Sequence, residues 1–105
     1  MTECCIVFTT AGSQSEADKI ADALLSGRLA SCVQQNNIQS AYHWKGKIER
    51  NDEILLLIKT RAEFYPAVEK TIKENHSYET PQIVMVPISG GLPAYLDWIK
   101  NETGE

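Results

Sequence analysis

The sequence predicts an α+β protein with a four-stranded antiparallel sheet, one long hairpin and a C-terminal helix. Short runs of β-branched and aromatic residues alternate with segments of helical periodicity, which indicates mixed secondary structure. The dipeptide Lys45–Gly46 lies between two long segments of loosely alternating polarity, as is typical of a hairpin turn. With 105 residues, the chain is expected to form a single domain, residues 1–105, whose core needs no disulfides.

The N-terminal part predicts a buried strand followed by a helix. Cys4–Thr10 is a compact apolar run of the length of a buried strand. Ser13–Glu16 has the spacing of a capping box, in which Ser13 caps the new helix and Glu16 reaches back towards it. Apolar residues at helical spacing follow, and Gly27 is expected to end the helix in the left-handed conformation.

Leu29–Trp44 and Lys47–Thr60 predict two long antiparallel strands. Each spans more than a dozen residues, against about 5 to 6 for a usual strand, so the hairpin should overhang the sheet. An exposed arm that carries Tyr42 and Trp44 favours aggregation unless another chain covers it, which predicts an oligomer. The alternative is a bent hairpin that curls over its own sheet. Its polar break would consist of Asn36, Asn37, Asn51 and Asp52.

A second helix is predicted after the hairpin. Thr60–Glu63 repeats the capping-box spacing, and Phe64, Val68 and Ile72 follow on one helical face. The same step of four residues reaches His76, so we expect a partly buried imidazole at the end of this helix.

The C-terminal part predicts a strand and a last helix. Thr80–Ile88 contains a short apolar run, and in residues 92–102 Pro93 suits a first helical turn. Leu92, Leu96 and Ile99 form the expected apolar stripe of this helix. The resulting βαββαβ order, with right-handed crossovers, predicts the ferredoxin-like arrangement with helices on one face of the sheet.

Several strings of this chain together resemble the CutA family, the divalent-cation tolerance proteins. The resemblance covers nearly the whole chain and implies a ferredoxin-like homotrimer whose long hairpins pair between subunits, similar to the PII signalling proteins. It also implies a link with tolerance to copper and other divalent metals, and no catalytic reaction. The strings are "LASCV", "YHWKGKIERNDEILLLIKT", "HSYETPQIV" and "YLDWI". The residues that carry the resemblance are Tyr42, Trp44, Gly46, Glu53, Lys59, Thr60, His76, Tyr78, Glu79 and Pro81.

The resemblance makes His76 the candidate metal ligand. In the bacterial members credited with copper sites, the assigned ligands are a cysteine and two adjacent histidines, and these positions match Thr9, Asn75 and His76 here. Copper prefers two or three soft or imidazole ligands at one point, so His76 alone implies at most weak copper binding. The family also usually has proline where this chain has Ser77, which changes how His76 is presented.

The residues leave two roles open for His76. Its imidazole could be a structural group bonded to a backbone carbonyl or to Glu79 at the helix end. It could also serve a ligand in a cleft between subunits, and a bond from Glu79 could orient it there. In the implied trimer, this cleft would be lined by Tyr42, Trp44, Lys59, Tyr78 and Glu79.

The other candidate metal ligands are expected to be structural. Cys4 and Cys5 are neighbours on one strand, so they project to opposite faces and cannot chelate one ion. Cys32 is expected to be a small core residue, and His43 to face solvent or another subunit.

Composition excludes several classes of partner. The net charge of −4 and the lack of a basic cluster argue against nucleic acid. A membrane-spanning helix needs about 20 apolar residues, and no apolar run in this sequence approaches that length. The three cysteines fit a reducing compartment, so we expect a cytoplasmic protein. Common catalytic motifs are absent, so we expect no enzyme. The alternative function is a PII-like signalling module that binds a small anion or metabolite between subunits, with Lys59 supplying charge.

Overall fold

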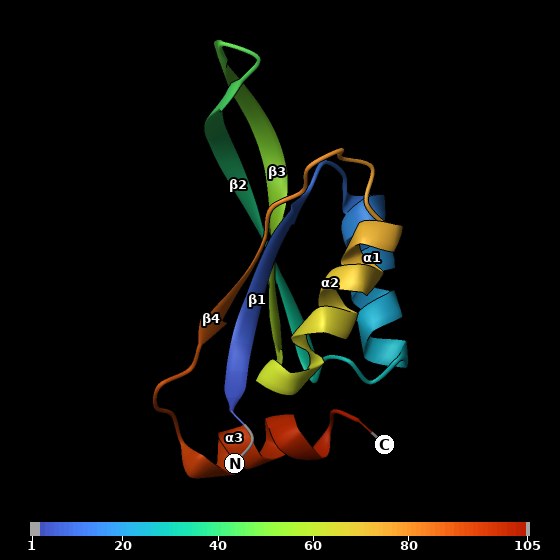
Figure 1. Ribbon diagram of the computed structural model, residues 1–105, viewed down its shortest axis with the longest axis vertical. Helices are drawn as coiled ribbons and strands as arrows, with labels where there is room; N and C mark the ends of the chain where they lie inside the picture. Colours follow the sequence, from blue (N-terminus) through green and yellow to red (C-terminus); the bar gives the residue numbers. More distant parts are fainter. Residues whose placement is uncertain (1–2, 105) are drawn as a thin grey trace.

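The structure, a computed structural model, describes residues 3–104 and contains one four-stranded antiparallel sheet (Figure 1). Met1, Thr2 and Glu105, at the ends of the predicted domain, lie outside the described residues. The strand order β2-β3-β1-β4 and the antiparallel pairing of every neighbouring pair confirm the predicted ferredoxin-like α+β fold. The strands are β1 (Cys4–Ala11), β2 (Cys32–Trp44), β3 (Lys47–Arg61) and β4 (Ile83–Pro87).

Two helices, α1 (Gln14–Ser26) and α2 (Tyr65–Glu74), cover one face of the sheet (Figure 1). The core between them and the sheet consists of alternate residues of the strands and the apolar stripes of both helices. Its wholly buried members include Val7, Ile20, Leu24, Leu56, Ile58, Val68 and Ile72. Cys5 also belongs to this core, whereas its neighbour Cys4 points to the other face, where its thiol lies 3.7 Å from the carbonyl of Leu96.

The start of α1 confirms half of the predicted capping box. The hydroxyl of Ser13 accepts from the backbone N–H of Glu16 at 3.2 Å. The carboxylate of Glu16 does not return to Ser13, because its Oε2 accepts from the backbone N–H of Ser77, 3.1 Å away. The second half of the prediction is therefore wrong, since a tertiary contact takes the group that the local motif would use.

The end of α1 also differs from the prediction. Gly27 has φ −83, and the left-handed residue is Arg28, with φ 55. Arg28 is held there by its side chain, whose Nε donates to the carbonyl of Gly104 at 2.6 Å and whose Nη2 donates to that of Asn101 at 3.0 Å. These contacts offset the cost of about 1 kcal/mol that a side chain has in this conformation.

The β2–β3 hairpin is long and continuous. Its ladder runs without a break from Cys32 opposite Lys59 to Trp44 opposite Lys47, which contradicts the bent alternative. Because β1 ends opposite Ile54, the distal arm extends beyond the sheet (Figure 1) and gives the chain an extent of 44 Å along its longest axis. Lys45 and Gly46 both have positive φ, as the predicted two-residue turn requires.

The second predicted capping box is wrong. Thr60 remains in β3, where its hydroxyl donates to the carbonyl of Leu29 at 2.6 Å, and a short 3₁₀ helix (Ala62–Phe64) precedes α2. No side chain caps α2, but Pro66 lies in its first turn, as expected. Strand pairing therefore prevails over the local helix signal at this position.

The last helix, α3 (Pro93–Asn101), lies across one end of the sheet and contacts β1 and β3 (Figure 1). Ile99 is buried, whereas Leu92 is 70 % exposed, so the predicted stripe is wrong at its first position. After α3, the guanidinium of Arg61 donates to the hydroxyl and the carbonyl of Thr103 at 2.9 and 2.7 Å. Among residues 3–104, no helix is long and apolar enough to cross a membrane.

Candidate functional site

His76 lies just after α2, and its side chain is enclosed although the residue as a whole is only half-buried. Its side chain is 0 % exposed, which confirms the predicted burial. Nε2 lies 2.6 Å from the carbonyl oxygen of Thr10, at the end of β1. Nδ1 accepts from the backbone N–H of Tyr78 at 3.1 Å. The imidazole thus joins the end of β1 to the loop that follows α2.

These two hydrogen bonds assign the tautomer of His76. A carbonyl only accepts, so Nε2 carries the proton, and Nδ1 offers its lone pair to the N–H of Tyr78. Both ring nitrogens are therefore in use. A metal ion can bind this imidazole only if it displaces one of the two partners.

The carboxylate near His76 belongs to Glu16, not to Glu79 as expected from the sequence. Oε1 of Glu16 lies 3.5 Å from Nδ1 of His76 and is buried without a hydrogen-bond partner. Oε2 of the same group accepts from the N–H of Ser77. Glu16 therefore ties the first turn of α1 to the loop after α2.

Tyr78 connects the same loop to the base of the hairpin. Its hydroxyl donates to Oε2 of Glu53 at 2.8 Å, and its ring lies 4.7 Å from that of His76. Desolvation, followed by the hydrogen bond to Glu53 and the nearby negative charges, raises the pKa of Tyr78 to about 12. The phenol consequently stays protonated at neutral pH and donates its hydrogen bond to Glu53.

Gly12 makes room for this arrangement. A Cβ atom at Gly12 would lie 3.0 Å from the hydroxyl of Tyr78 and 3.5 Å from its ring. A larger residue would therefore push the phenol away from Glu53. The loop after β1, the loop after α2 and the hairpin base meet at this point.

The structure does not gather the predicted cleft residues within one chain. Lys59 lies six residues from Glu53 on β3, about 20 Å along the strand, and donates to the hydroxyl of Tyr95 at 3.1 Å. Tyr42 and Trp44 lie on the distal hairpin, where the side-chain amide of Asn51 donates to the hydroxyl of Tyr42. Glu79 is exposed. Of this set, only Tyr78 touches His76, and a cleft built from all of them would need more than one chain.

The positions that match the copper ligands of bacterial relatives hold no soft donors around His76. Thr9 is buried, and its hydroxyl lacks a hydrogen-bond partner. Asn75 donates its side-chain amide to the carbonyl of Thr71 at 2.8 Å. Across residues 3–104, no group of three or more His, Cys, Asp or Glu side chains is arranged to hold a metal ion. His43 is exposed, as expected, and Cys32 is only partly buried.

Sequence reasoning missed Glu16 and Gly12 as members of this site. The position of Glu16 indicated helix capping. Nothing in the sequence indicates that its carboxylate accepts a hydrogen bond from a loop residue 61 positions away. Glu53 entered only through the family resemblance. A charged residue directly before the buried run Ile54–Ile58 is a signal that could have found it.

Known proteins provide an independent comparison. Residues 5–102 match the family profile described as "CutA1 divalent ion tolerance protein". The divalent-cation tolerance protein CutA of Thermus thermophilus is 39 % identical over 100 residues, which cover 94 % of this chain and 97 % of the relative. A chloroplastic CutA 1 of rice is 38 % identical over 101 residues, 95 % of this chain, but the chain spans only 57 % of the length of this relative.

The solved structures agree with the sequence relatives. The structure described as the periplasmic divalent cation tolerance protein CutA of Archaeoglobus fulgidus has a TM-score of 0.92 and 41 % identity, and the match covers 94 % of this chain and 97 % of that one. The CutA1 structure of rice gives a TM-score of 0.94 at 36 % identity and covers 98 % of this chain and 95 % of that one. The fold, the profile and the identity over almost the whole length all agree with the resemblance seen in the sequence, and the chain belongs to the CutA1 divalent ion tolerance family.

Proposed function

We propose that this protein takes part in tolerance to divalent metal ions, copper among them, as a cytoplasmic homotrimer that carries out no catalytic step. The names of its Thermus and Archaeoglobus relatives support the link to divalent cations. The three cysteines, which form no disulfide in the described chain, support a reducing location.

The observation that supports the assembly is an apolar sheet face that α1 and α2 leave open and that α3 contacts only at one end. On the face opposite α1 and α2, Ile6 and Phe8 of β1 lie level with Lys59 and Leu57 of β3. The neighbouring residues of β4, Val86 and Val84, are 46 % and 47 % exposed. Exposed apolar surface of this kind supports the proposal that another chain covers this face.

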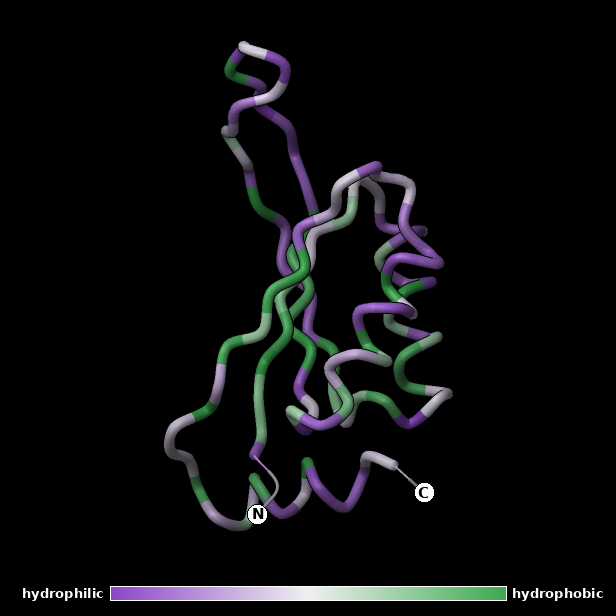
Figure 2. Tube along the Cα trace, in the orientation of Figure 1, coloured by the Kyte–Doolittle hydropathy of each residue, from purple (hydrophilic) through white to green (hydrophobic). Residues whose placement is uncertain are grey.

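Figure 2 supports placing the interface on the sheet as well as on the hairpin. The central strands are mostly hydrophobic, whereas the distal hairpin is mostly hydrophilic with single hydrophobic residues. On that arm, Tyr42, Trp44 and Ile48 are 39 %, 42 % and 63 % exposed. A second copy that packs on the open face could cover these side chains at the same time.

Light scattering coupled to gel filtration tests the assembly. We expect a mass three times that of the 11.7 kDa chain for the wild-type protein. Val84→Glu combined with Val86→Glu should reduce the mass to that of one chain, because two carboxylates would be buried without partners in the interface. Leu25→Glu is the matched control, since Leu25 is 41 % exposed on the helical layer. A single-chain mass for the wild type would refute the trimer.

Copper binding through His76 is the metal part of the proposal. Because Nε2 holds its proton against the carbonyl of Thr10, copper would take the lone pair of Nδ1 and displace the N–H of Tyr78. The cost of that displacement supports weak binding. Calorimetric titration of Cu(II) should give saturable heat for the wild type and for His43→Asn, and none for His76→Asn. Equal heats for the wild type and His76→Asn would exclude His76 as a ligand.

The PII-like alternative has one supporting feature, the cation of the half-buried Lys59. Its ammonium lies 5.3 Å from the ring centre of Tyr95, which in turn stacks on Trp98 with ring centres 5.6 Å apart. A cation beside two exposed aromatic rings could bind a planar anion. Thermal-shift screening separates the two functions, because stabilisation by anions or nucleotides but not by metals would favour the signalling module.

A further inference from the structure

Two hydrogen-bond acceptors lie close together beside the loop after α2. Oε1 of Glu16 is 3.5 Å from Nδ1 of His76. At neutral pH a carboxylate oxygen only accepts hydrogen bonds, and Nδ1 is the nitrogen of this imidazole that carries no proton. No hydrogen atom therefore joins the two atoms. Because both offer lone pairs, this arrangement favours a cation between them.

The described side chains do not supply this cation. No Lys or Arg within residues 3–104 forms an ion pair with Glu16. Oε2 of Glu16 accepts from the backbone N–H of Ser77, but Oε1 is buried and has no hydrogen-bond partner within the same residues. A buried carboxylate oxygen without a partner is unfavourable. The missing cation therefore has to come from the solvent.

The distance between the two acceptors favours a metal ion over a proton. A charge-assisted N–H···O bond has about 2.7 to 2.9 Å between its heavy atoms, less than the 3.5 Å found here. In tetrahedral zinc sites, imidazole nitrogen and carboxylate oxygen each lie about 2.0 to 2.2 Å from the ion, so the two ligand atoms are about 3.4 Å apart. The spacing of Glu16 and His76 matches such a pair of ligands.

The ligand types and the exposure of the pair favour the same kind of ion. Imidazole and carboxylate are both common ligands of Zn(II), whereas soft monovalent ions prefer thiolates. The side chain of Glu16 is 15 % exposed, so the pair lies close to solvent although the side chain of His76 is buried. Two protein ligands leave the other positions of the ion to water, which implies weak binding.

We propose that Glu16 and His76 together bind Zn(II), with Oε1 of Glu16 as the second protein ligand beside Nδ1 of His76. The ion displaces the N–H of Tyr78 from Nδ1 and provides the partner that Oε1 lacks. Oε2 keeps its hydrogen bond from Ser77, which holds the carboxylate in place. This inference rests on the proposed metal binding at His76, to which it adds a second ligand and a preferred ion.

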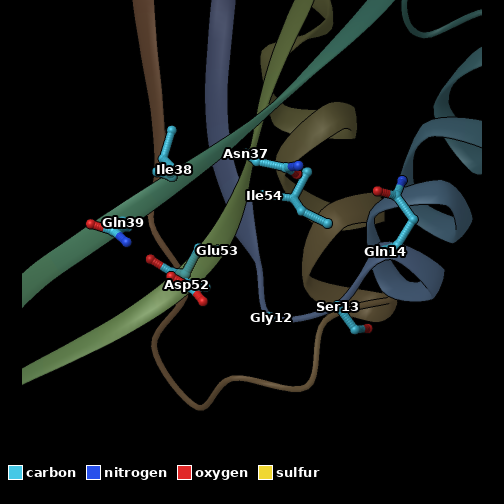
Figure 3. Close-up of a pocket in the computed structure, with 9 residues that line it drawn as sticks. All are labelled: Gly12, Ser13, Gln14, Asn37, Ile38, Gln39, Asp52, Glu53 and Ile54. Atoms are coloured by element: carbon cyan, nitrogen blue, oxygen red, sulfur yellow. The ribbon is translucent and has the colours of Figure 1, made fainter.

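Glu53 provides a matched control for Glu16. It also bonds to the loop after α2, because its Oε2 accepts from the hydroxyl of Tyr78 at 2.8 Å. Figure 3 shows Glu53 in the wall of an open pocket of about 520 Å³ between the start of α1 and the base of the hairpin. Neither Glu16 nor His76 lines this pocket. Glu53→Gln therefore removes a nearby negative charge without touching the proposed ligands.

Calorimetric titration of Zn(II) into the full chain tests the proposal. We expect saturable heat for the wild type and for Glu53→Gln, none for His76→Asn, and an affinity at least about tenfold lower for Glu16→Gln. Groups that only support a metal ligand already change metal affinity about ten- to a hundredfold, so loss of a ligand should cost no less. Glutamine keeps an oxygen that can accept from Ser77, and thermal unfolding without metal checks that the fold is retained.

The visible absorption of bound Co(II), which depends on its ligands, distinguishes a ligand from a neighbouring charge. At saturating Co(II), the spectrum of Glu16→Gln should differ from that of the wild type, whereas Glu53→Gln should leave it unchanged.

The outcomes separate this inference from the function on which it rests. Equal zinc affinities and equal Co(II) spectra for the wild type and Glu16→Gln, with binding lost in His76→Asn, would overturn the role of Glu16 and leave metal binding at His76 intact. Saturable heat with Cu(II) but none with Zn(II) would also overturn the inference alone. No saturable heat with either ion would overturn both.

Discussion

The backbone N–H of Ser77 donates to the carboxylate of Glu16 across 61 positions of the chain, with 3.1 Å between N and Oε2. The CutA family usually has proline at this position, and a proline has no N–H to donate. In this chain, a hydrogen bond to α1 therefore anchors the loop that a proline ring would otherwise stiffen.

Ser77→Pro should destabilise this protein although it restores the usual family residue. It removes the donor to Glu16, whose other oxygen already lacks a partner, and we expect a loss of about 1 to 3 kcal/mol. Urea unfolding measures the change. Ser77→Ala keeps the N–H and should stay within about 0.5 kcal/mol of the wild type. The double variant Glu16→Ala with Ser77→Pro should lose less than the sum of the single changes, and strict additivity would exclude the coupling.

His76→Ala should cost more than any other single substitution in the site. It leaves the carbonyl of Thr10 and the N–H of Tyr78 without their partner and opens a cavity, with an expected loss of about 2 to 5 kcal/mol. The exposed His43 offers a control, because His43→Ala should change the unfolding free energy by less than about 0.5 kcal/mol. Similar losses for both histidines would show that the imidazole of His76 does not bridge the two loops.

Gly12→Ala should weaken the contact between Tyr78 and Glu53. The new methyl group would lie 3.0 Å from the phenol oxygen, so either the ring or the loop has to move, and we expect a loss of about 1 kcal/mol. At Gly90 a Cβ atom meets nothing within 4 Å, so Gly90→Ala should be neutral or slightly stabilising. If Tyr78→Phe abolishes the difference between the two alanine variants, the hydroxyl is confirmed as the obstacle.

Alkaline pH should lower the free energy of unfolding through deprotonation of Tyr78. Its pKa rises from 10.0 to about 12 on folding, so the folded state holds the proton more tightly than the unfolded state. The resulting stabilisation is complete below pH 10 and is lost as the pH rises towards 12. Tyr65, raised to about 12 mainly by burial and then by Glu69, acts in the same direction. Tyr78→Phe should therefore reduce the fall in the urea midpoint across this pH range. Adding Tyr65→Phe should reduce that fall further. An unchanged fall in the double variant would contradict the assignment.

The two capping boxes show how far local sequence signals reach. Ser13–Glu16 and Thr60–Glu63 have the same spacing, yet only Ser13 caps a helix. Thr60 is paired within the sheet, and its hydroxyl donates a hydrogen bond to the carbonyl of Leu29. Strand pairing therefore prevails over the local helix-capping signal. Similarly, Gly27 was the expected left-handed residue, but the contacts of Arg28 with the C-terminal segment moved that conformation one position onward.

The sequence by itself determined the order of the elements, the overhanging hairpin, the burial of His76 and the family. These features depend on hydrophobic periodicity, turn residues and motif identity, which are local properties of the chain. Only the tertiary structure decided which groups meet at the site. Glu16, Gly12 and Glu53 reach Ser77 and Tyr78 because β1, α1, β3 and the loop after α2 converge at one end of the sheet. The hydrogen bonds of Glu16 and Glu53 and the close approach of Gly12 to Tyr78 join residues tens of positions apart, and such contacts follow from packing rather than from spacing.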